Sequence, residues 1–344
     1  MKKITFIIVS FVILFSACEK DDLSGTLDDV LYVRYKNAEM PAYIHGNGSE
    51  KIFLIILHGG PGGKAMEYRV GALKDLEERY AIVYFDQRGS GMSSGNYSKK
   101  DITPELMAED VLALVKVLKF KYGNDLKLFL LGHSWGGALG TRVLLMDQSP
   151  FKGWIEVDGG HNLVDMFDYQ VTRFLEVADE QISEGNSVDF WTDLKSDVNE
   201  IKEEGYSDEN GGKLNELGHS TEERLMDDHV LDDKDKVSVD FLNYLYEESI
   251  IISSVSSSVV NGNLNYLWTT LDYTPQLNQI TIPSMIMWGE YDLVIPYSMG
   301  VEAYNAIGST DKYWVLFHGS AHSPMMNEVK QFEQEVITFI EAHK

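Results

Sequence analysis

A serine lies in a glycine-flanked turn between an apolar run and a helix-forming segment. Residues 131–138 read L-G-H-S-W-G-G-A, which places Ser134 in a G-x-S-x-G motif. The run at 127–131 has the length of a buried strand, and residues 138–146 favour a helix. A tight turn between strand and helix projects the serine hydroxyl from the top of a sheet. The pattern therefore predicts a nucleophilic serine and hydrolytic chemistry.

A serine hydroxyl is a weak nucleophile that needs a base, an acid that orients the base, and donors for the oxyanion. After a turn of this kind the acid and the histidine follow the serine in that order. Asp292 and His322 follow strand-like runs at 282–288 and 313–317, so both are expected at the carboxyl edge of the sheet. We predict that His322 is the general base toward Ser134 and that Asp292 orients its imidazole.

A second glycine-rich turn follows the apolar run at 53–57. Residues 58–63 read H-G-G-P-G-G. Such a turn lets a backbone N–H group approach a developing negative charge without steric obstruction. We predict that the N–H groups of Gly60 and Trp135 form the oxyanion hole.

Four motifs, taken in order, resemble the proline iminopeptidase branch of the α/β-hydrolases. They are H-G-G-P-G at 58–62, D-Q-R-G-S-G at 86–91, G-H-S-W-G-G at 132–137 and G-E-Y-D at 289–292. The resemblance is weak between about 161 and 275. It implies the release of an N-terminal residue, often proline, from short peptides without a metal or other cofactor.

The resemblance also bears on the choice of catalytic residues. The family's catalytic histidine follows a turn of small residues, which favours His322 over its rival His318, and Glu290 is the alternative acid to Asp292. Some relatives carry a glutamate directly after the acid that helps to hold the substrate amine, whereas this chain has Leu293. Proline specificity therefore stays open.

The chain also differs from the family's pattern at residues 157–162, which read V-D-G-G-H-N.

Several polar residues within the motifs are expected to have structural roles. We expect these residues to fasten loops or to pack the serine turn: His58, Asp86, Arg88 and His133.

Strand-like and helix-like segments alternate along most of the chain. This alternation predicts a mostly parallel, eight-stranded sheet covered by helices on both faces, an α/β-hydrolase fold. From 161 to 273 the strand rhythm is lost and helical patterns dominate. We predict a helical cap there, inserted between two parts of the core at 30–160 and 274–344.

The predicted cap is strongly acidic. The 344-residue chain has a net charge of −25, and residues 161–250 contain 25 acidic and 7 basic residues, a local charge of −18. Such a surface repels nucleic acid and attracts a small molecule or short peptide with a free amine. The candidate amine-binding carboxylates flank apolar positions: Glu176, Asp179, Glu180, Glu222 and Glu223.

The N-terminus resembles a bacterial lipoprotein signal. Lys2 and Lys3 precede an apolar run at 4–15, which is too short to cross a bilayer, and small residues then precede Cys18, the only cysteine. The resemblance implies a signal peptide at 1–17, a lipid on Cys18 that anchors the protein to a membrane, and an acidic linker at 18–29. The expected location is the cell envelope, in the periplasm or on the outer-membrane surface. An ordinary secretory signal is the alternative.

Two other functions stay open. A carboxylesterase for small esters would use the same serine chemistry. A surface binding protein could keep the hydrolase shell without turnover.

Overall fold

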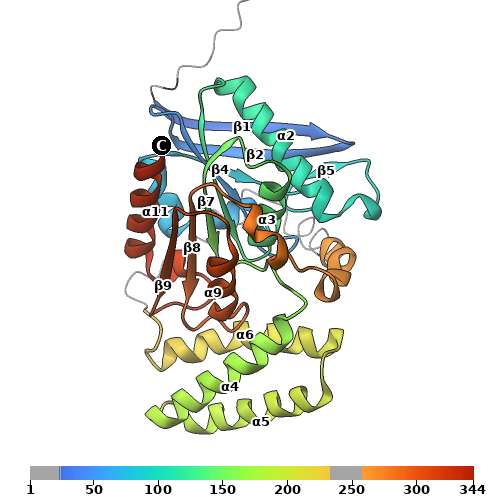
Figure 1. Ribbon diagram of the computed structural model, residues 1–344, viewed down its shortest axis with the longest axis vertical. Coiled ribbons are helices and arrows are strands. Elements are labelled where there is room, and N and C mark those ends of the chain that lie inside the picture. Colours follow the sequence, from blue (N-terminus) through green and yellow to red (C-terminus); the bar gives the residue numbers. More distant parts are fainter. Residues whose placement is uncertain (1–22, 24, 233–257) are drawn as a thin grey trace, which may run out of the picture.

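A mixed sheet lies at the centre of the computed structural model, which describes residues 23, 25–232 and 258–344 (Figure 1). Its strands are β1 (Thr26–Tyr35), β2 (Ala38–Asn47), β3 (Ile52–Leu57), β4 (Ala81–Phe85), β5 (Ser94–Gly95), β6 (Lys127–His133), β7 (Phe151–Val157), β8 (Ser284–Gly289) and β9 (Lys312–Phe317). The order is β1-β2-β4-β3-β6-β7-β8-β9, and β5 pairs with β2. Pairing is antiparallel around β2 and parallel from β4 to β9. The predicted α/β fold is confirmed.

Helices cover both faces of the sheet because its central strands are apolar on both sides. Every residue of β3, β4 and β8 is buried, as expected of parallel strands between two helical layers. Separate hydrophobic clusters fill the two faces. One face is covered by α2 (Pro104–Tyr122), α3 (Trp135–Asp147) and α9 (Tyr297–Ala306), and the other by α1 (Gly71–Asp75), α10 (Pro324–Asn327) and α11 (Val329–His343).

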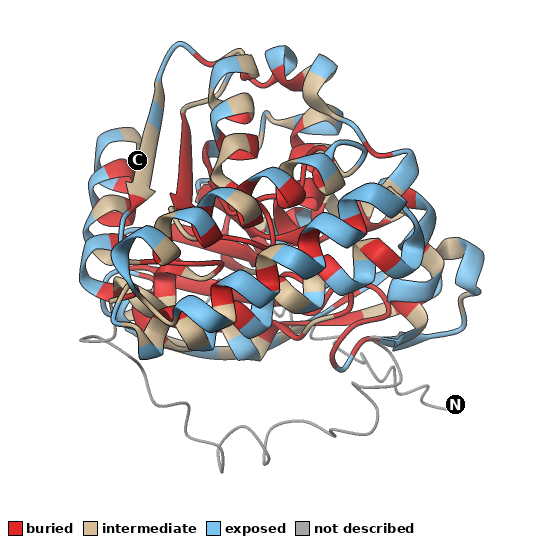
Figure 2. Cartoon of the chain, turned by 90° about the horizontal axis from the view of Figure 1, so that it is seen from below, coloured by how far each residue is buried: buried red, intermediate tan, exposed pale blue. Residues whose placement is uncertain are grey.

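Three amphipathic helices form a layer below the sheet in the view of Figure 1. They are α4 (Met166–Glu184), α5 (Val188–Glu204) and α6 (Asp208–Asp227). Figure 2 shows helices across this side of the molecule with buried inner faces and exposed outer faces. Their shared hydrophobic cluster contains Trp191 and also Leu293 and Ala321, which belong to loops at the carboxyl edge of the sheet. The layer therefore packs directly on the loops that carry the predicted acid and base.

The chain enters and leaves this layer through one paired crossing. Asn162 and Asp272 form an antiparallel bridge. On either side of it, Leu163 N–H donates to the Leu271 carbonyl at 2.8 Å and Tyr273 N–H donates to the His161 carbonyl at 2.9 Å. These contacts lie at the boundaries predicted for the cap, 161 and 273.

Two details of the sequence prediction are wrong. The sheet has nine strands instead of eight, because the two-residue strand β5 gives no periodic signal. The predicted linker at 18–29 is too long, because β1 already begins at Thr26. Asp28 and Asp29 resemble linker residues, yet charged side chains are common on an edge strand.

The predicted signal peptide at 1–17 and the lipidation site Cys18 lie outside the described residues. In the part of the chain that the structure describes, no helix has the length and hydropathy needed to span a bilayer.

A fully buried ion pair joins the loop after β4 to α2. Arg88 binds Asp110 through two hydrogen bonds, Nε to Oδ2 at 2.8 Å and Nη2 to Oδ1 at 2.6 Å. The same guanidinium donates to the carbonyls of Tyr35 and Lys36 in the β1–β2 hairpin. This pair confirms that Arg88 fastens neighbouring loops.

We predict that Asp110→Ala lowers the free energy of unfolding by about 3–5 kcal/mol, because it leaves the Arg88 charge buried without a carboxylate. Urea unfolding followed by circular dichroism measures the loss. Glu209→Ala is the control, since it breaks an exposed ion pair with Lys213 and should leave the midpoint unchanged. Equal losses in the two variants would contradict burial as the cause.

Candidate active site

Ser134 occupies a strained turn between β6 and α3. Its φ and ψ angles are 56° and −123°, so it lies in the positive-φ region that side chains rarely adopt. Its carbonyl accepts hydrogen bonds from the N–H groups of Gly137 and Gly160 at 2.9 and 3.1 Å, which hold the turn. Gly136 is required here, because a Cβ atom would lie 2.0 Å from the Leu57 carbonyl oxygen. The local geometry matches the predicted nucleophile turn.

Asp292 and His322 are brought together from the loops after β8 and β9. His322 Nδ1 and Asp292 Oδ2 are 2.8 Å apart. The other carboxylate oxygen of Asp292 accepts the N–H groups of Val294 and Ile295, each at 2.8 Å. Both side chains of the pair are buried, so the carboxylate is fixed in one orientation.

The electrostatic surroundings favour a charged His322. Burial alone lowers the pKa of its imidazole, but the Asp292 carboxylate and then Glu222 on α6 act against burial and leave the pKa above its ordinary value. The imidazolium that forms when a base accepts a proton is therefore stabilised in place.

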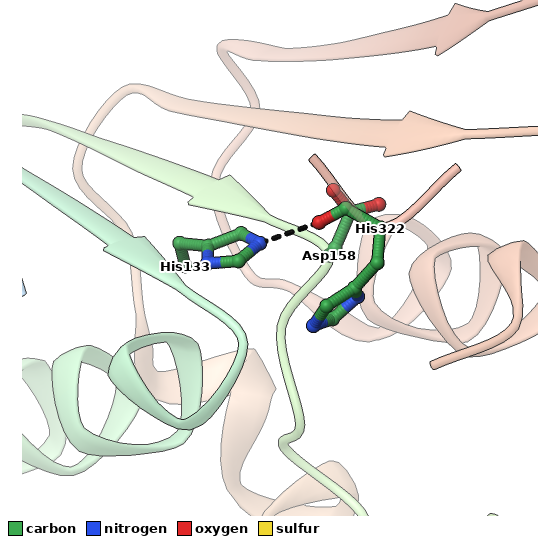
Figure 3. Close-up of side chains that lie close together, drawn as sticks. All are labelled: His133, Asp158 and His322. Carbon is green, nitrogen blue, oxygen red and sulfur yellow. Dashed lines mark hydrogen bonds between the residues drawn. The ribbon is translucent and has the colours of Figure 1, made fainter. Parts of the chain in front are cut away.

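His133 connects the serine turn to the base. It is the residue before Ser134, its ring lies 4.8 Å from the His322 ring between centroids, and its Nε2 lies 2.6 Å from the His322 carbonyl oxygen (Figure 3). Among the described residues no hydrogen bond joins Ser134 Oγ to His322. Contacts of this kind are often long in unliganded enzymes and tighten when substrate binds.

The competing residues form a separate pair at the surface. His318 Nδ1 lies 2.6 Å from Glu290 Oε2, and the His318 side chain is 76% exposed. Since they bind each other, neither joins the buried pair of Asp292 and His322.

Gly60 and Trp135 line the same pocket as Ser134. Among the described residues, none accepts a hydrogen bond from either backbone N–H group. Gly60 has a φ of 125°, and a Cβ atom there would lie 2.6 Å from Gly62 N, so only glycine fits this tight loop. The two predicted oxyanion donors are thus close to the serine and available.

His58 and Gln87 hold the oxyanion loop against the serine turn. The Gln87 side chain donates to the His58 carbonyl at 2.8 Å and accepts from Trp135 Nε1 at 3.0 Å. His58 Nδ1 lies 2.9 Å from the Gly59 carbonyl oxygen, and its Nε2 accepts the Gln87 N–H group. Burial lowers the pKa of His58 to about 4, so the ring is neutral. The predicted fastening role of His58 is confirmed. No role was predicted for Gln87, although it belongs to the D-Q-R-G-S-G motif.

Tyr68 is a site residue that sequence reasoning missed. Its hydroxyl accepts the Gly59 N–H group at 2.7 Å and lies 2.6 Å from His133 Nδ1. Burial, followed by the His322 charge, lowers the pKa of His133 to about 3. Its neutral ring therefore accepts a hydrogen bond from the Tyr68 hydroxyl at Nδ1 and donates one from Nε2 to the His322 carbonyl. A chain of hydrogen bonds therefore runs from the oxyanion loop to the His322 backbone. No motif surrounds Tyr68 that could have indicated this.

His133, Asp158 and His322 have potential ligand atoms within 4.8 Å of one another (Figure 3). Both ring nitrogens of His133 already have partners, and His322 Nδ1 is bound to Asp292. A metal would have to displace these hydrogen bonds, so the donor set fits a hydrogen-bonded cluster better than a metal centre.

The pocket that Ser134 lines is also lined by α6 and by the segment at 261–268. Its wall is mixed, with asparagine amides, aromatic rings and apolar side chains. Asp208 is the one carboxylate among its described lining residues; it accepts hydrogen bonds from Asn265 Nδ2 at 2.8 Å and the Tyr206 hydroxyl at 3.3 Å.

The five predicted amine-binding carboxylates do not line this pocket. Four of them have other surroundings: Glu176 pairs with Arg173, Asp179 with Lys195, Glu180 with Tyr291, and Glu223 is not fully buried. Glu222 accepts the His322 backbone N–H group at 3.2 Å. Helical periodicity alone does not tell which carboxylate of an acidic helix borders a pocket, so the exposed Asp208 was missed.

Comparisons with known proteins support the same fold. A family model described as the alpha/beta hydrolase fold matches residues 52–204. The probable aminopeptidase YbaC of Bacillus subtilis (strain 168) is 25% identical over 314 residues, which cover 86% of this chain and 91% of that protein. A proline iminopeptidase of Saccharolobus solfataricus is 28% identical over 294 residues, 84% of each chain.

A solved structure also matches nearly the whole chain. The proline iminopeptidase-related protein from Thermus thermophilus superposes with a TM-score of 0.57 and 23% identity, over 92% of this chain and 98% of that chain. This protein has the α/β-hydrolase fold and resembles the prolyl aminopeptidases.

Proposed function

We propose that this protein is a serine hydrolase of the aminopeptidase type, which releases N-terminal residues from short peptides. The observation that carries the proposal is the pocket that Ser134 shares with two available backbone donors and with Asp208. The relatives named as aminopeptidases and proline iminopeptidases support the same chemistry.

The reaction begins with Ser134 Oγ attacking the scissile carbonyl carbon while His322 accepts the serine proton. Asp292 stabilises the imidazolium, and the N–H groups of Gly60 and Trp135 bind the oxyanion. His322 then protonates the departing amine as the C–N bond breaks, which leaves an acyl-enzyme. Water attacks the ester, gives its proton to His322, and the serine recovers it.

Asp208 accounts for the choice of substrate. Asp208 lines the pocket at the start of α6, where its carboxylate pairs with the ammonium group of a peptide N-terminus. Hydrogen bonds to a charged group contribute about 1.5–3 kcal/mol. The remaining acidic residues of the cap raise the local concentration of cationic substrates.

A carboxylesterase is the second candidate. Apolar side chains form much of the pocket wall and would accept a small acyl group. They are Leu163, Met166, Leu264, Leu267, Val294 and Ile295.

We predict that the purified protein cleaves proline amide or other aminoacyl amides and reacts with a fluorophosphonate probe. Ser134→Ala should abolish labelling and reduce kcat/KM by about 10⁴-fold or more. Ser183→Ala, a substitution on the exposed face of α4, should retain both. Turnover of short-chain esters without any amide cleavage would make the protein a carboxylesterase. An unlabelled wild-type protein without turnover would make it a binding protein.

We predict that Asp208→Asn raises KM for aminoacyl amides about tenfold or more, since the ammonium loses its charged partner. Turnover of an ester that has no amine should not change. Glu209→Gln makes the same change of net charge one residue further along, on a side chain that pairs with Lys213 at the surface. If both variants raise KM equally, the effect is the charge of the whole cap and not recognition by Asp208.

We further propose that a lipid on Cys18 anchors the protein in the bacterial envelope, in the periplasm or on the outer-membrane surface. The small residues before the only cysteine support this assignment. We predict that radiolabelled palmitate enters the wild-type protein during expression in bacteria and does not enter Cys18→Ser. Equal labelling of both proteins, or of neither, would rule the lipid anchor out.

A further inference from the structure

Asp158 is a buried carboxyl group beside the proposed base that the mechanism above does not use. It follows β7 and begins the D-G-G-H segment that departs from the family pattern. Its φ of 46° is uncommon for a residue other than glycine. The side chain is fully buried, and its Oδ1 accepts the Gly289 N–H group at 2.9 Å.

The second oxygen of Asp158 has no hydrogen-bond donor among the described residues. His133 and His322 each have a ring nitrogen within 4.8 Å of a carboxylate oxygen of Asp158 (Figure 3). Neither ring donates to the unpartnered oxygen: His133 binds Tyr68 and the His322 carbonyl, and His322 Nδ1 binds Asp292. A buried carboxylate oxygen without a hydrogen-bond donor destabilises the folded protein, unless the carboxyl group itself is protonated and donates a hydrogen bond.

The Asp292 carboxyl group provides the other half of the argument, because it and Asp158 are both buried beside the His322 ring and Asp292 raises the pKa of Asp158. Two ionised carboxylates side by side in a buried site repel each other strongly, and neither offers a hydrogen-bond donor. A proton on Asp158 removes both problems at once, since the unpartnered oxygen becomes a donor toward Asp292.

The titration of Asp158 agrees with this geometry. Burial, followed by the charge of Asp292, raises its pKa well above the ordinary value, and the Gly289 N–H group opposes the rise only in part. The titratable groups around Asp158 come from several loops and from α6. They are Asp292, Glu222, His322, His133 and Tyr68.

We propose that Asp158 is a positioning residue whose protonated carboxyl group donates a hydrogen bond to Asp292. When the Asp292 charge is removed by substitution, Asp158 ionises and provides the negative charge beside His322. The inference rests on the proposed serine chemistry, since it assigns a partner to the proposed acid and base.

The hydrogen bond from Asp158 to Asp292 also affects the pKa of His322. The bond from Asp158 adds a third donor to the Asp292 carboxylate, beside the N–H groups of Val294 and Ile295. It draws charge away from Asp292, which keeps the pKa of His322 from rising further above its ordinary value. A general base works best when its pKa lies near the working pH.

Replacing Asp292 by asparagine tests whether Asp158 can supply the negative charge beside His322. Without the neighbouring charge, Asp158 loses its proton to solvent at lower pH, and its carboxylate stabilises the imidazolium from within 4.8 Å. We expect the rate of fluorophosphonate labelling to fall by about 10²-fold in Asp292→Asn and by about 10⁴-fold in the Asp158→Asn/Asp292→Asn double variant. The single variant should show an alkaline rise in rate that the double variant lacks.

The outcomes separate the two proposals. A wild-type protein that the probe does not label contradicts the proposed function. A labelled wild type in which the single and double variants share one rate and one pH profile overturns the role of Asp158. Thermal unfolding of each variant identifies losses caused by misfolding.

Infrared spectroscopy tests the proton without relying on activity. At about pH 9 ordinary carboxyl groups are ionised. So are Glu222, whose pKa burial raises to about 7, and Asp86 and Asp110, whose pKa values burial raises to about 6. The wild type should still show a protonated carboxyl band, which Asp158→Asn loses and Glu222→Gln keeps. Absence of this band from the wild type overturns the proposal.

Discussion

Parallel strand pairing is the constraint on which the rest of the structure depends. Because β6, β7, β8 and β9 run in the same direction and in adjacent positions, their carboxyl ends open on one edge of the sheet. The loops that leave these ends carry Ser134, Asp158, Asp292 and His322. Residues far apart in the chain therefore share one small volume, and no long-range interaction besides the backbone ladder is needed to gather them.

Burial then decides how these groups are arranged. A polar side chain in the interior must find a hydrogen-bonding partner, and at this edge most partners come from neighbouring loops. Tyr68 and His133 join the oxyanion loop to the base, while Gln87 joins it to Trp135. The site is held by these connected bonds, so its geometry is a property of the network and not of any single loop.

The helical layer adds both cover and charge. Its hydrophobic cluster includes Leu293 and Ala321, each next to a residue of the acid–base pair, and Glu222 reaches the His322 backbone from α6. Packing of the layer and positioning of the base are thus coupled. The same helix presents Asp208 to the pocket, so one element contributes to both the electrostatics of the base and the lining of the substrate cavity.

The sequence by itself determined the parts that depend on local pattern. Apolar runs and their alternation with helices identified the parallel sheet, and glycine-flanked motifs identified the Ser134 turn and the loop that carries Gly60, because backbone geometry there permits few residue types. The order of motifs also singled out Asp292 and His322, which the structure joins by a hydrogen bond. Tertiary structure alone decided which carboxylate of the acidic cap lines the pocket, that Tyr68 binds His133 and that Asp158 lies beside the base. Those placements depend on contacts between distant loops, and such contacts leave no periodic signal in the chain.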